Sequence, residues 1–318
     1  MGGKLLAPWL VSTLLFEPVV LAITSTSPSR RQLLVRGVAA GAAGALALGT
    51  PLAPARSAPP RPYPSAEDVR GELADADWSE GWPFSTSSFA RVDESDDARF
   101  YAEPRLVYHV DDAAVRAIKR HYARVLQDAA RGREAPLDVL DVASSWVSFL
   151  PPDIYQGDAT ASRVVGVGLN RDELAANPQL TEWQVQDLNV QPLMAWLPSA
   201  SFDAALLTVS VDYLTKPREL FAEVARVLRP GAPFVVTFSD RVFFTKCVSH
   251  WTGRSDLDHI DAVGAYFQFA ATADELRGGA ASAAHLFDPA QAVRIDSAPR
   301  DGVDPVFVVA ARRACAHP

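Results

Sequence analysis

Continuous apolar runs alternate with helically spaced apolar positions along the second half of the chain. A short segment that is apolar throughout is typical of a strand buried on both faces, as in parallel sheets. Between these segments, apolar residues recur every three or four positions and predict connecting helices. The alternation therefore predicts an α/β fold built from βαβ units. The predicted strands lie at 137–142, 163–168, 202–209 and 233–238, and the segment 202–209 is almost uninterrupted in its apolar character.

Local signals place the ends of the helices between these strands. One helix is expected to begin after Asn170, and another to begin at Pro217, whose fixed φ suits a first turn, and to end at 229–231. A short helical turn is expected between the first strand and the prolines at 151–152. Residues 240–269 are expected to be mostly helical.

Two further segments complete the predicted layer of strands and helices. Asp111 is a good N-cap for a helix that starts near Val110 and ends near Gly132, because its carboxylate can accept the free amides of the first turn. The segments 292–295 and 306–310 predict an antiparallel hairpin that closes the sheet.

The first 58 residues have the composition of a targeting leader, with five basic side chains and one acid. An apolar stretch at 5–23 is typical of a signal-peptide core or a membrane anchor. A second unit joins an arginine pair at 30–31 to an apolar run and to Ala-Pro-Ala at 53–55, and it resembles a twin-arginine export signal. Two such units in series indicate a plastid protein, with the thylakoid lumen as its destination. Export, or anchoring through 5–23 with a chance arginine pair, is the alternative.

Charge and cysteine content limit the partners of the mature chain. The 318 residues are 48% hydrophobic and 21% charged, which suits one substantial core. Without the leader, 25 basic and 37 acidic side chains remain, and this formal charge of −12 disfavours nucleic acid and anionic membranes. We expect a soluble mature part, with any membrane insertion confined to the leader before processing. Cys247 and Cys315 lack metal-ligand spacing, so no metal site is expected.

Residues 137–310 resemble the class I S-adenosylmethionine-dependent methyltransferases, motif after motif. Residues 201–214, which begin SFDAALL, and residues 221–231, FAEVARVLRPG, are similar to the type 11 group. The stretch DVASSWVSFLP at 141–151, together with PRLVYHVD at 104–111, resembles a plant and algal plastid subgroup. The resemblance implies a Rossmann-like fold with a mostly parallel seven-stranded sheet, an antiparallel closing hairpin and helices on both faces.

The resemblance also divides the chain and implies a cofactor. We expect a leader at 1–58, a linker and N-terminal extension with one helix at 59–136, a methyltransferase-like domain at 137–313 and a tail at 314–318. The implied cofactor is S-adenosylmethionine. It would bind at the carboxyl ends of the strands, where open α/β sheets place their ligands and where Asp141 follows the first buried strand.

The first cofactor motif departs from the family. There the first strand ends in a D-x-G-x-G loop, but Ala143, Ser145 and Val147 stand at the positions where glycines are expected. Glycine tolerates positive φ and lets backbone amides approach a ligand closely, so these changes are expected to reshape the pocket. Ser144 and Ser145 could contact the ligand or only cap a helix.

The second motif departs as well, whereas the third is kept. Gly168 stands where the family carries the acid that binds the ribose hydroxyls, and Asn170 could replace it or only cap a helix. A Gly168→Asp, Ser145→Gly variant is therefore expected to tighten cofactor binding. Asp187 matches the position that receives the adenine amino group, unless it is only a turn acid. The candidate cofactor-binding residues are Asp141, Ala143, Ser144, Ser145, Gly168, Asn170, Asp187, Leu188 and Val209.

Two functions remain open from the sequence. The first is methyl transfer to a small molecule whose identity cannot be read from the residues; no catalytic residue is assigned, because in-line transfer depends mainly on positioning. The second is a non-catalytic binding or assembly protein with a degenerate cofactor site. A nicotinamide oxidoreductase is disfavoured because no G-x-G-x-x-G follows the first strand. Tyr108, His109, Tyr213 and His250 could face a substrate or simply be packed.

Overall fold

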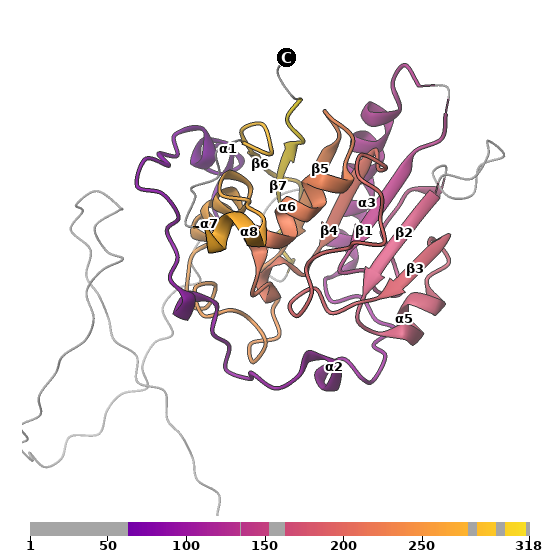
Figure 1. Ribbon diagram of the computed structural model, residues 1–318, viewed down its shortest axis with the longest axis horizontal. Helices are drawn as coiled ribbons and strands as arrows, with labels where there is room; N and C mark the ends of the chain where they lie inside the picture. Colours follow the sequence, from indigo (N-terminus) through magenta and orange to yellow (C-terminus); the bar gives the residue numbers. More distant parts are fainter. Residues whose placement is uncertain (1–62, 134, 153–162, 279–284, 297–302, 316–318) are drawn as a thin grey trace, which may run out of the picture. The chain divides into compact units, whose positions relative to one another are not determined.

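A seven-stranded sheet crosses the protein in the order β3-β2-β1-β4-β5-β7-β6 (Figure 1). The computed structural model describes residues 63–133, 135–152, 163–278, 285–296 and 303–315, so the predicted leader lies outside them. Neighbouring strands from β3 to β5 are parallel, and β7 is antiparallel to both β5 and β6, which confirms the predicted fold class. The strands are β1 (Asp138–Val142), β2 (Arg163–Gly168), β3 (Glu182–Val185), β4 (Ala204–Thr208), β5 (Pro233–Phe238), β6 (Gln291–Arg294) and β7 (Phe307–Arg312).

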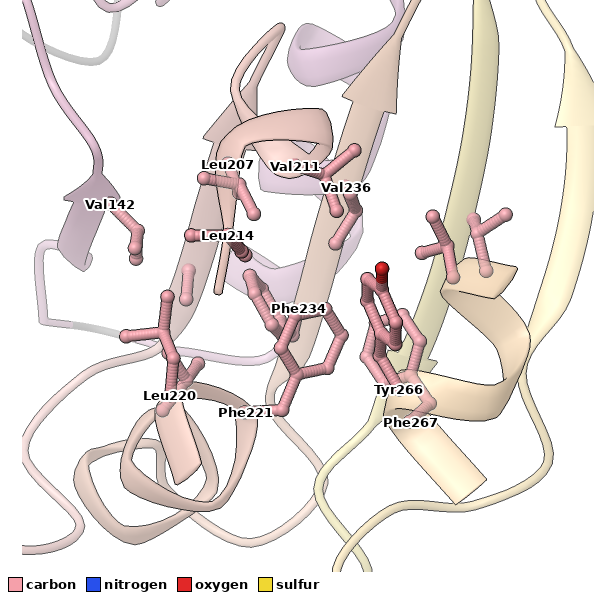
Figure 2. Close-up of a cluster of buried hydrophobic side chains, with 14 of the residues drawn as sticks. Val142, Leu207, Val211, Leu214, Leu220, Phe221, Phe234, Val236, Tyr266 and Phe267 are labelled. Carbon is pink, nitrogen blue, oxygen red and sulfur yellow. The ribbon is translucent and has the colours of Figure 1, made fainter. Parts of the chain in front are cut away.

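Helices cover both faces of the sheet. On one face, α3 packs Tyr122 and Leu126 against strands β1, β4 and β5. On the other, α6 and α7 bury an aromatic cluster that includes Phe221 and Tyr266 (Figure 2). The described helices are α1 (Ala66–Ala74), α2 (Asp97–Phe100), α3 (Asp112–Ala130), α5 (Arg171–Ala176), α6 (Pro217–Val227), α7 (Asp256–Gln268) and α8 (Ala273–Arg277), with 3-10 turns η2 (Thr86–Phe89) and η3 (Val211–Tyr213).

Most helix boundaries agree with the sequence signals. Asp111 caps α3, because its side chain accepts the Ala114 amide at 2.8 Å. Asn170 caps α5, and Pro217 is the first residue of α6. The segment before α3 belongs to the same body as the sheet, since Val69 of α1 is fully buried in the core on the α6 and α7 face.

Two helix predictions were wrong. Residues 143–151 form a loop rather than a helical turn, because Ala143 and Phe149 take positive φ and the Ser144 amide donates to the Val167 carbonyl of β2. Residues 240–255 are also irregular, and only α7 is helical within 240–269. Their backbone groups bond instead to the N-terminal segment: the Asp93 amide donates to the Thr245 carbonyl at 2.8 Å.

Candidate functional site

One cavity of about 170 Å³ lies at the carboxyl ends of β1, β2 and β4. Parallel strands converge there, and the crossover between β1 and β4 leaves a crevice for a ligand. All nine residues proposed from the sequence line this cavity: Asp141, Ala143, Ser144, Ser145, Gly168, Asn170, Asp187, Leu188 and Val209.

The loop after β1 is tied to its neighbours by its own polar groups. The Ser144 amide donates to the Val167 carbonyl at 2.8 Å. The Ser145 hydroxyl donates to Glu173 Oε2 at 2.6 Å, and the Ser145 carbonyl accepts Asn177 Nδ2 at 2.8 Å. Of the three family glycine positions, only Ala143 adopts the left-handed region, with φ of 54°. The loop therefore holds its shape without glycine, at a strain of order 1 kcal/mol for Ala143.

Gly168 is required by that loop. A Cβ atom added at Gly168 would lie 2.0 Å from the Ser144 carbonyl oxygen and 3.1 Å from Leu174 Cδ2. No side chain fits at that distance from a backbone atom. The altered glycine loop and the missing acid at position 168 are therefore linked. The main chain of Ser144 fills the space that an acid at 168 would need. An acid at 168 therefore requires the loop to move, so tighter cofactor binding by the Gly168→Asp, Ser145→Gly variant remains a prediction that depends on this movement.

Asn170 has no hydrogen-bonding capacity left for a ribose. Its Oδ1 accepts the amides of Asp172 and Glu173 at 2.8 and 3.0 Å, which caps α5. Its Nδ2 donates to the carbonyls of Tyr101 and Ala102 at 2.7 and 3.1 Å. Asn170 lines the cavity, but its amide groups are engaged in capping and in holding residues 101–102.

The loop after β3, unlike Asn170 after β2, leaves a polar side-chain atom available to a ligand. Asp187 Oδ1 accepts the amides of Asn189 and Val190 at 2.8 and 3.2 Å. In the described part of the chain, Oδ2 of Asp187 receives no hydrogen bond, so it can accept one from a ligand. Leu188 is buried beside it, and Val209, with φ of 45°, turns its amide to the Thr237 carbonyl at 2.7 Å.

Asp141 is the buried carboxyl at the centre of the crevice. Burial raises the pKa of Asp141 to about 6, although hydrogen bonds from Ser144 and Ser148 lower it. The Ser144 hydroxyl donates to Asp141 Oδ2 at 2.5 Å. Desolvation therefore outweighs the hydrogen bonds, and the carboxyl changes charge close to neutral pH.

The N-terminal segment 91–109, here called the strap, forms one wall of the cavity. It contributes Asp97, Tyr101, Arg105, Val107, Tyr108 and His109 to the lining. Trp146 of the loop after β1 donates its indole Nε1–H to the Val107 carbonyl at 3.1 Å. From the sequence, residues 104–111 are part of a resemblance, and Tyr108 and His109 are candidates to face a substrate. The acidic and aromatic composition upstream gave no sign that this segment lines the crevice.

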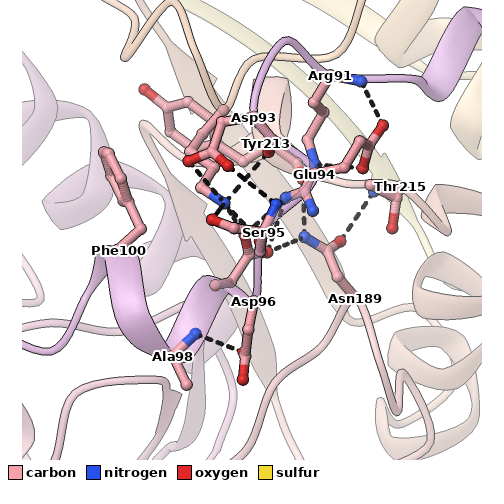
Figure 3. Close-up of polar contacts among 12 residues, drawn as sticks. Arg91, Asp93, Glu94, Ser95, Asp96, Ala98, Phe100, Asn189, Tyr213 and Thr215 are labelled. Atoms are coloured by element: carbon pink, nitrogen blue, oxygen red, sulfur yellow. Dashed lines mark hydrogen bonds and ion pairs between the residues drawn. The ribbon is translucent and has the colours of Figure 1, made fainter.

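A buried ionic cluster fixes the strap to loops that follow three strands (Figure 3). Lys246, with 0% of its surface exposed, lies 3.1 Å from Asp97 Oδ1 and 3.3 Å from Asp93 Oδ2. Arg91 Nη1 donates to both oxygens of Asp97, at 2.8 and 2.7 Å. Asn189 Nδ2 donates to Asp97 Oδ2 at 3.0 Å and to the Tyr213 carbonyl at 2.9 Å. Each buried charge has an opposite partner, which such a cluster requires.

Glu173 was missed by the sequence prediction. This residue of α5 is 8% exposed, lines the cavity, and accepts the Arg105 amide on Oε1 at 2.7 Å. Since Oε2 accepts the Ser145 hydroxyl, Glu173 links the strap to the loop after β1. Its position in the first turn of a short helix is a common one for an acid, so the sequence offered no distinct signal.

The four candidate substrate-facing residues separate into two groups. Tyr108, His109 and Tyr213 line the cavity, whereas His250 does not. His250 Nε2 lies 2.6 Å from the Tyr266 hydroxyl, and its Nδ1 lies 2.8 Å from the Ser88 carbonyl, so it belongs to the aromatic core. Burial and the nearby Arg105 lower the pKa of His109, while Glu173 raises it. The net shift favours a neutral imidazole.

Among the residues that the structure describes, no helix has the length and apolar character needed to cross a bilayer. The same residues hold no group of three or more His, Cys, Asp or Glu side chains that could bind a metal ion.

The chain is similar to a known protein family and to several solved structures. Residues 141–236 match the methyltransferase domain family, type 11. A comparison with curated proteins gave no match. Among solved structures, a SAM-dependent methyltransferase from Aquifex aeolicus is 16% identical, with a TM-score of 0.41, over 73% of this chain and 100% of its own. Geranyl diphosphate C-methyltransferase from Streptomyces coelicolor is 18% identical, with a TM-score of 0.36, over 68% and 97%.

The family match coincides with the elements that build the crevice. It begins at Asp141, at the end of β1, and extends into β5, so it contains every candidate residue of the site. The cofactor that such a domain implies is S-adenosylmethionine. Residues 141–236, which include β2, β3, β4 and most of β5, are thus similar to the methyltransferase domain family over the part of the chain that borders the crevice.

Proposed function

We propose that the protein binds S-adenosylmethionine in this crevice and transfers its methyl group to a small-molecule acceptor. The observation that carries the proposal is the convergence of the nine candidate residues, from four separate chain segments, on one cavity. Fold alone would not support an activity, because one fold serves many functions. Polar groups placed at a strand-end crevice within a matched methyltransferase domain do support it.

The residues fit the cofactor in part. At the adenine end, Asp187 Oδ2 is available for the amino group and Leu188 offers an apolar surface. At the other end, Asp141 and the loop 143–145 would border the methionine part. Between the two ends, the acid that the family uses for the ribose is absent at Gly168. We therefore expect binding that is weaker than in a family member with both motifs.

When bound, the cofactor supplies a methyl group activated by its sulfonium. The contribution of this chain is to orient the acceptor and to exclude water, which an aromatic wall of Tyr101, Tyr108 and Phe243 can do. If the acceptor must lose a proton, His109 is the cavity-lining base that is neutral at physiological pH.

A specific observation favours a second candidate function. The Ser144 carbonyl fills the place of the ribose acid, and Asn170 has its amide engaged elsewhere. A protein with these features could keep the fold and bind another ligand, without catalysis.

Calorimetric titration of the purified protein with S-adenosylmethionine and S-adenosylhomocysteine separates the two. The enzyme proposal predicts micromolar dissociation constants, and predicts that Asp187→Ala weakens both at least tenfold, because a hydrogen bond to a charged group is lost. Asp128→Ala, at an exposed position of α3, is the matched control. Binding of neither ligand up to millimolar concentration would favour the non-catalytic reading instead.

We further propose that the protein acts in a plastid, within the thylakoid lumen, and belongs to the plant and algal subgroup. The location is supported by the two apolar units and the arginine pair of the leader, and the subgroup by the residues at 104–111 and 141–151. A lumenal location would require the cofactor to reach the lumen as well.

A further inference from the structure

Arg105 is a cation in the cavity wall with an unused donor. Its Nη2 donates to the Phe100 carbonyl at 2.9 Å, but its Nη1 is buried and has no hydrogen-bond partner among the described residues. The guanidinium carbon lies 4.7 Å from the ring centre of Phe100 and 5.4 Å from that of Phe243. Aromatic faces stabilise a cation but do not satisfy its N–H groups.

The acids near Arg105 are already engaged. Asp97, which also lines the cavity, pairs with Arg91 and Lys246. Glu173 accepts the backbone amide of Arg105 rather than its guanidinium. Within the described chain, Arg105 therefore forms no ion pair, although arginine in a cavity wall normally meets a carboxylate or phosphate. The unmet donor points to a group that arrives with a ligand.

We propose that Arg105 is the anion-binding residue of the crevice and receives a carboxylate carried by a bound ligand. Its planar donor set matches the two oxygens of a carboxylate. Because Phe100, Tyr101 and Phe243 surround the guanidinium, an aromatic or otherwise apolar group beside the anion would also be favoured. Nη1 is closed off from solvent, so a side chain of this wall moves when the anion binds.

Two molecules could bring that carboxylate: the acceptor, or the amino-acid part of the methyl donor. The surroundings favour the acceptor. Arg105 and its three ring neighbours all lie outside residues 141–236, the part of the chain that matches the methyltransferase domain family. The assignment of the carboxylate to an acceptor rests on the proposed methyl transfer. Anion binding by Arg105 can be measured whether or not the protein transfers a methyl group.

The experiment compares the wild-type protein with two variants. Arg105→Met keeps the apolar stem, and Arg105→Lys keeps the charge but loses the planar pair of guanidinium donors. Each is titrated with S-adenosylhomocysteine, with 5′-methylthioadenosine, which lacks the amino-acid part, and with benzoate as the aromatic carboxylate. Benzyl alcohol is the uncharged control. Thermal unfolding of each variant confirms that it is folded.

If Arg105 binds the carboxylate of the acceptor, Arg105→Met is expected to lower the affinity for benzoate at least tenfold and to leave the affinities for both nucleoside ligands unchanged. If Arg105 binds the carboxylate of the methyl donor, Arg105→Met is expected to lower the affinity for S-adenosylhomocysteine at least tenfold, but not that for 5′-methylthioadenosine. In either case, the affinity of Arg105→Lys is expected to lie between those of wild type and Arg105→Met. If Arg105→Met is folded and every affinity is unchanged, Arg105 only packs the wall and the proposal is overturned. If wild type binds benzoate but neither nucleoside ligand, the anion site stands and the methyltransferase proposal fails.

Discussion

The two walls of the crevice are held by different forces. The loop 143–145 is fixed by close backbone packing, with the Ser144 carbonyl directly on Gly168, and by serine hydroxyls that donate to Asp141 and Glu173. The strap 91–109 is fixed by buried ions, of which Lys246 and Asp97 are the most enclosed. The first wall lies within the matched domain, and most of the second lies before it. The wall within the matched domain therefore depends on close packing, whereas the strap outside it depends on buried charges.

This difference predicts how each wall fails. Close packing against a backbone atom tolerates no added volume, whereas a buried ionic cluster tolerates no loss of a charge. A substitution in either wall should therefore affect stability through a distinct mechanism.

The largest effect is expected at Lys246. In Lys246→Met the aliphatic length is kept, but Asp93 loses its cation, Asp97 keeps only Arg91, and the Asp93 and Ser95 carbonyls lose a donor. Breaking a buried pair from one side costs about 3–5 kcal/mol, and the lost hydrogen bonds keep the effect in this range although Arg91 remains. Urea unfolding of both proteins would measure the loss. Lys119→Met on α3, which lies outside the cluster, controls for removal of a positive charge. An equal, small change in the two variants would show that the strap does not depend on its ions.

Gly168→Ala tests the other wall. Its Cβ would lie 2.0 Å from the Ser144 carbonyl oxygen, so the loop must move, at a cost of about 3 kcal/mol, the upper part of the overpacking range. Gly71→Ala is the matched control, because nothing lies within 4 Å of a Cβ there and alanine suits the interior of α1. The unfolding midpoint should fall for the first variant and rise slightly for the second. A stable Gly168→Ala protein would mean that an acid at 168 can be accommodated after all.

The same contrast explains what the sequence could predict. The strands β2, β4 and β5 are mostly apolar, and β1 is apolar at three of its five positions, so their pattern located them. The edge strand β3 is largely exposed and reads Glu-Trp-Gln-Val, so its pairing with β2 could not be recognised from apolar content. Family motifs then placed all nine candidate residues at the crevice.

The roles within the crevice were less accessible, because they depend on contacts between distant residues. That Gly168 cannot carry an acid follows from the path of the loop at Ser144, which no local signal encodes. That the strap forms a wall depends on Lys246 reaching Asp97, about half the chain away in sequence. Such contacts are properties of tertiary packing, and neither propensity nor periodicity reports them.

The smallest of these effects is expected at Asp141, where it takes the form of a pH dependence. The folded pKa of about 6 is raised above the unfolded value, so the stability gained from the neutral carboxyl is present below about pH 4 and lost as the pH rises through 6. Asp141→Asn cannot ionise. It should be about 2 kcal/mol more stable than wild type at pH 8, after allowance for the weakened Ser144 hydrogen bond, and nearly equal at pH 4.

Unfolding curves at pH 4, 6 and 8 measure this difference, and the exposed substitution Asp128→Asn serves as the control. Asp212 and Asp256 also have raised pKa values, but they are present in both proteins and cancel in the comparison. If the Asp141→Asn protein also loses its affinity for S-adenosylhomocysteine while gaining stability, the buried carboxyl is retained for the ligand at the expense of the fold. Parallel stability curves for the variant and wild type would instead place Asp141 in a solvated setting, and the cofactor wall would be more open than its packing indicates.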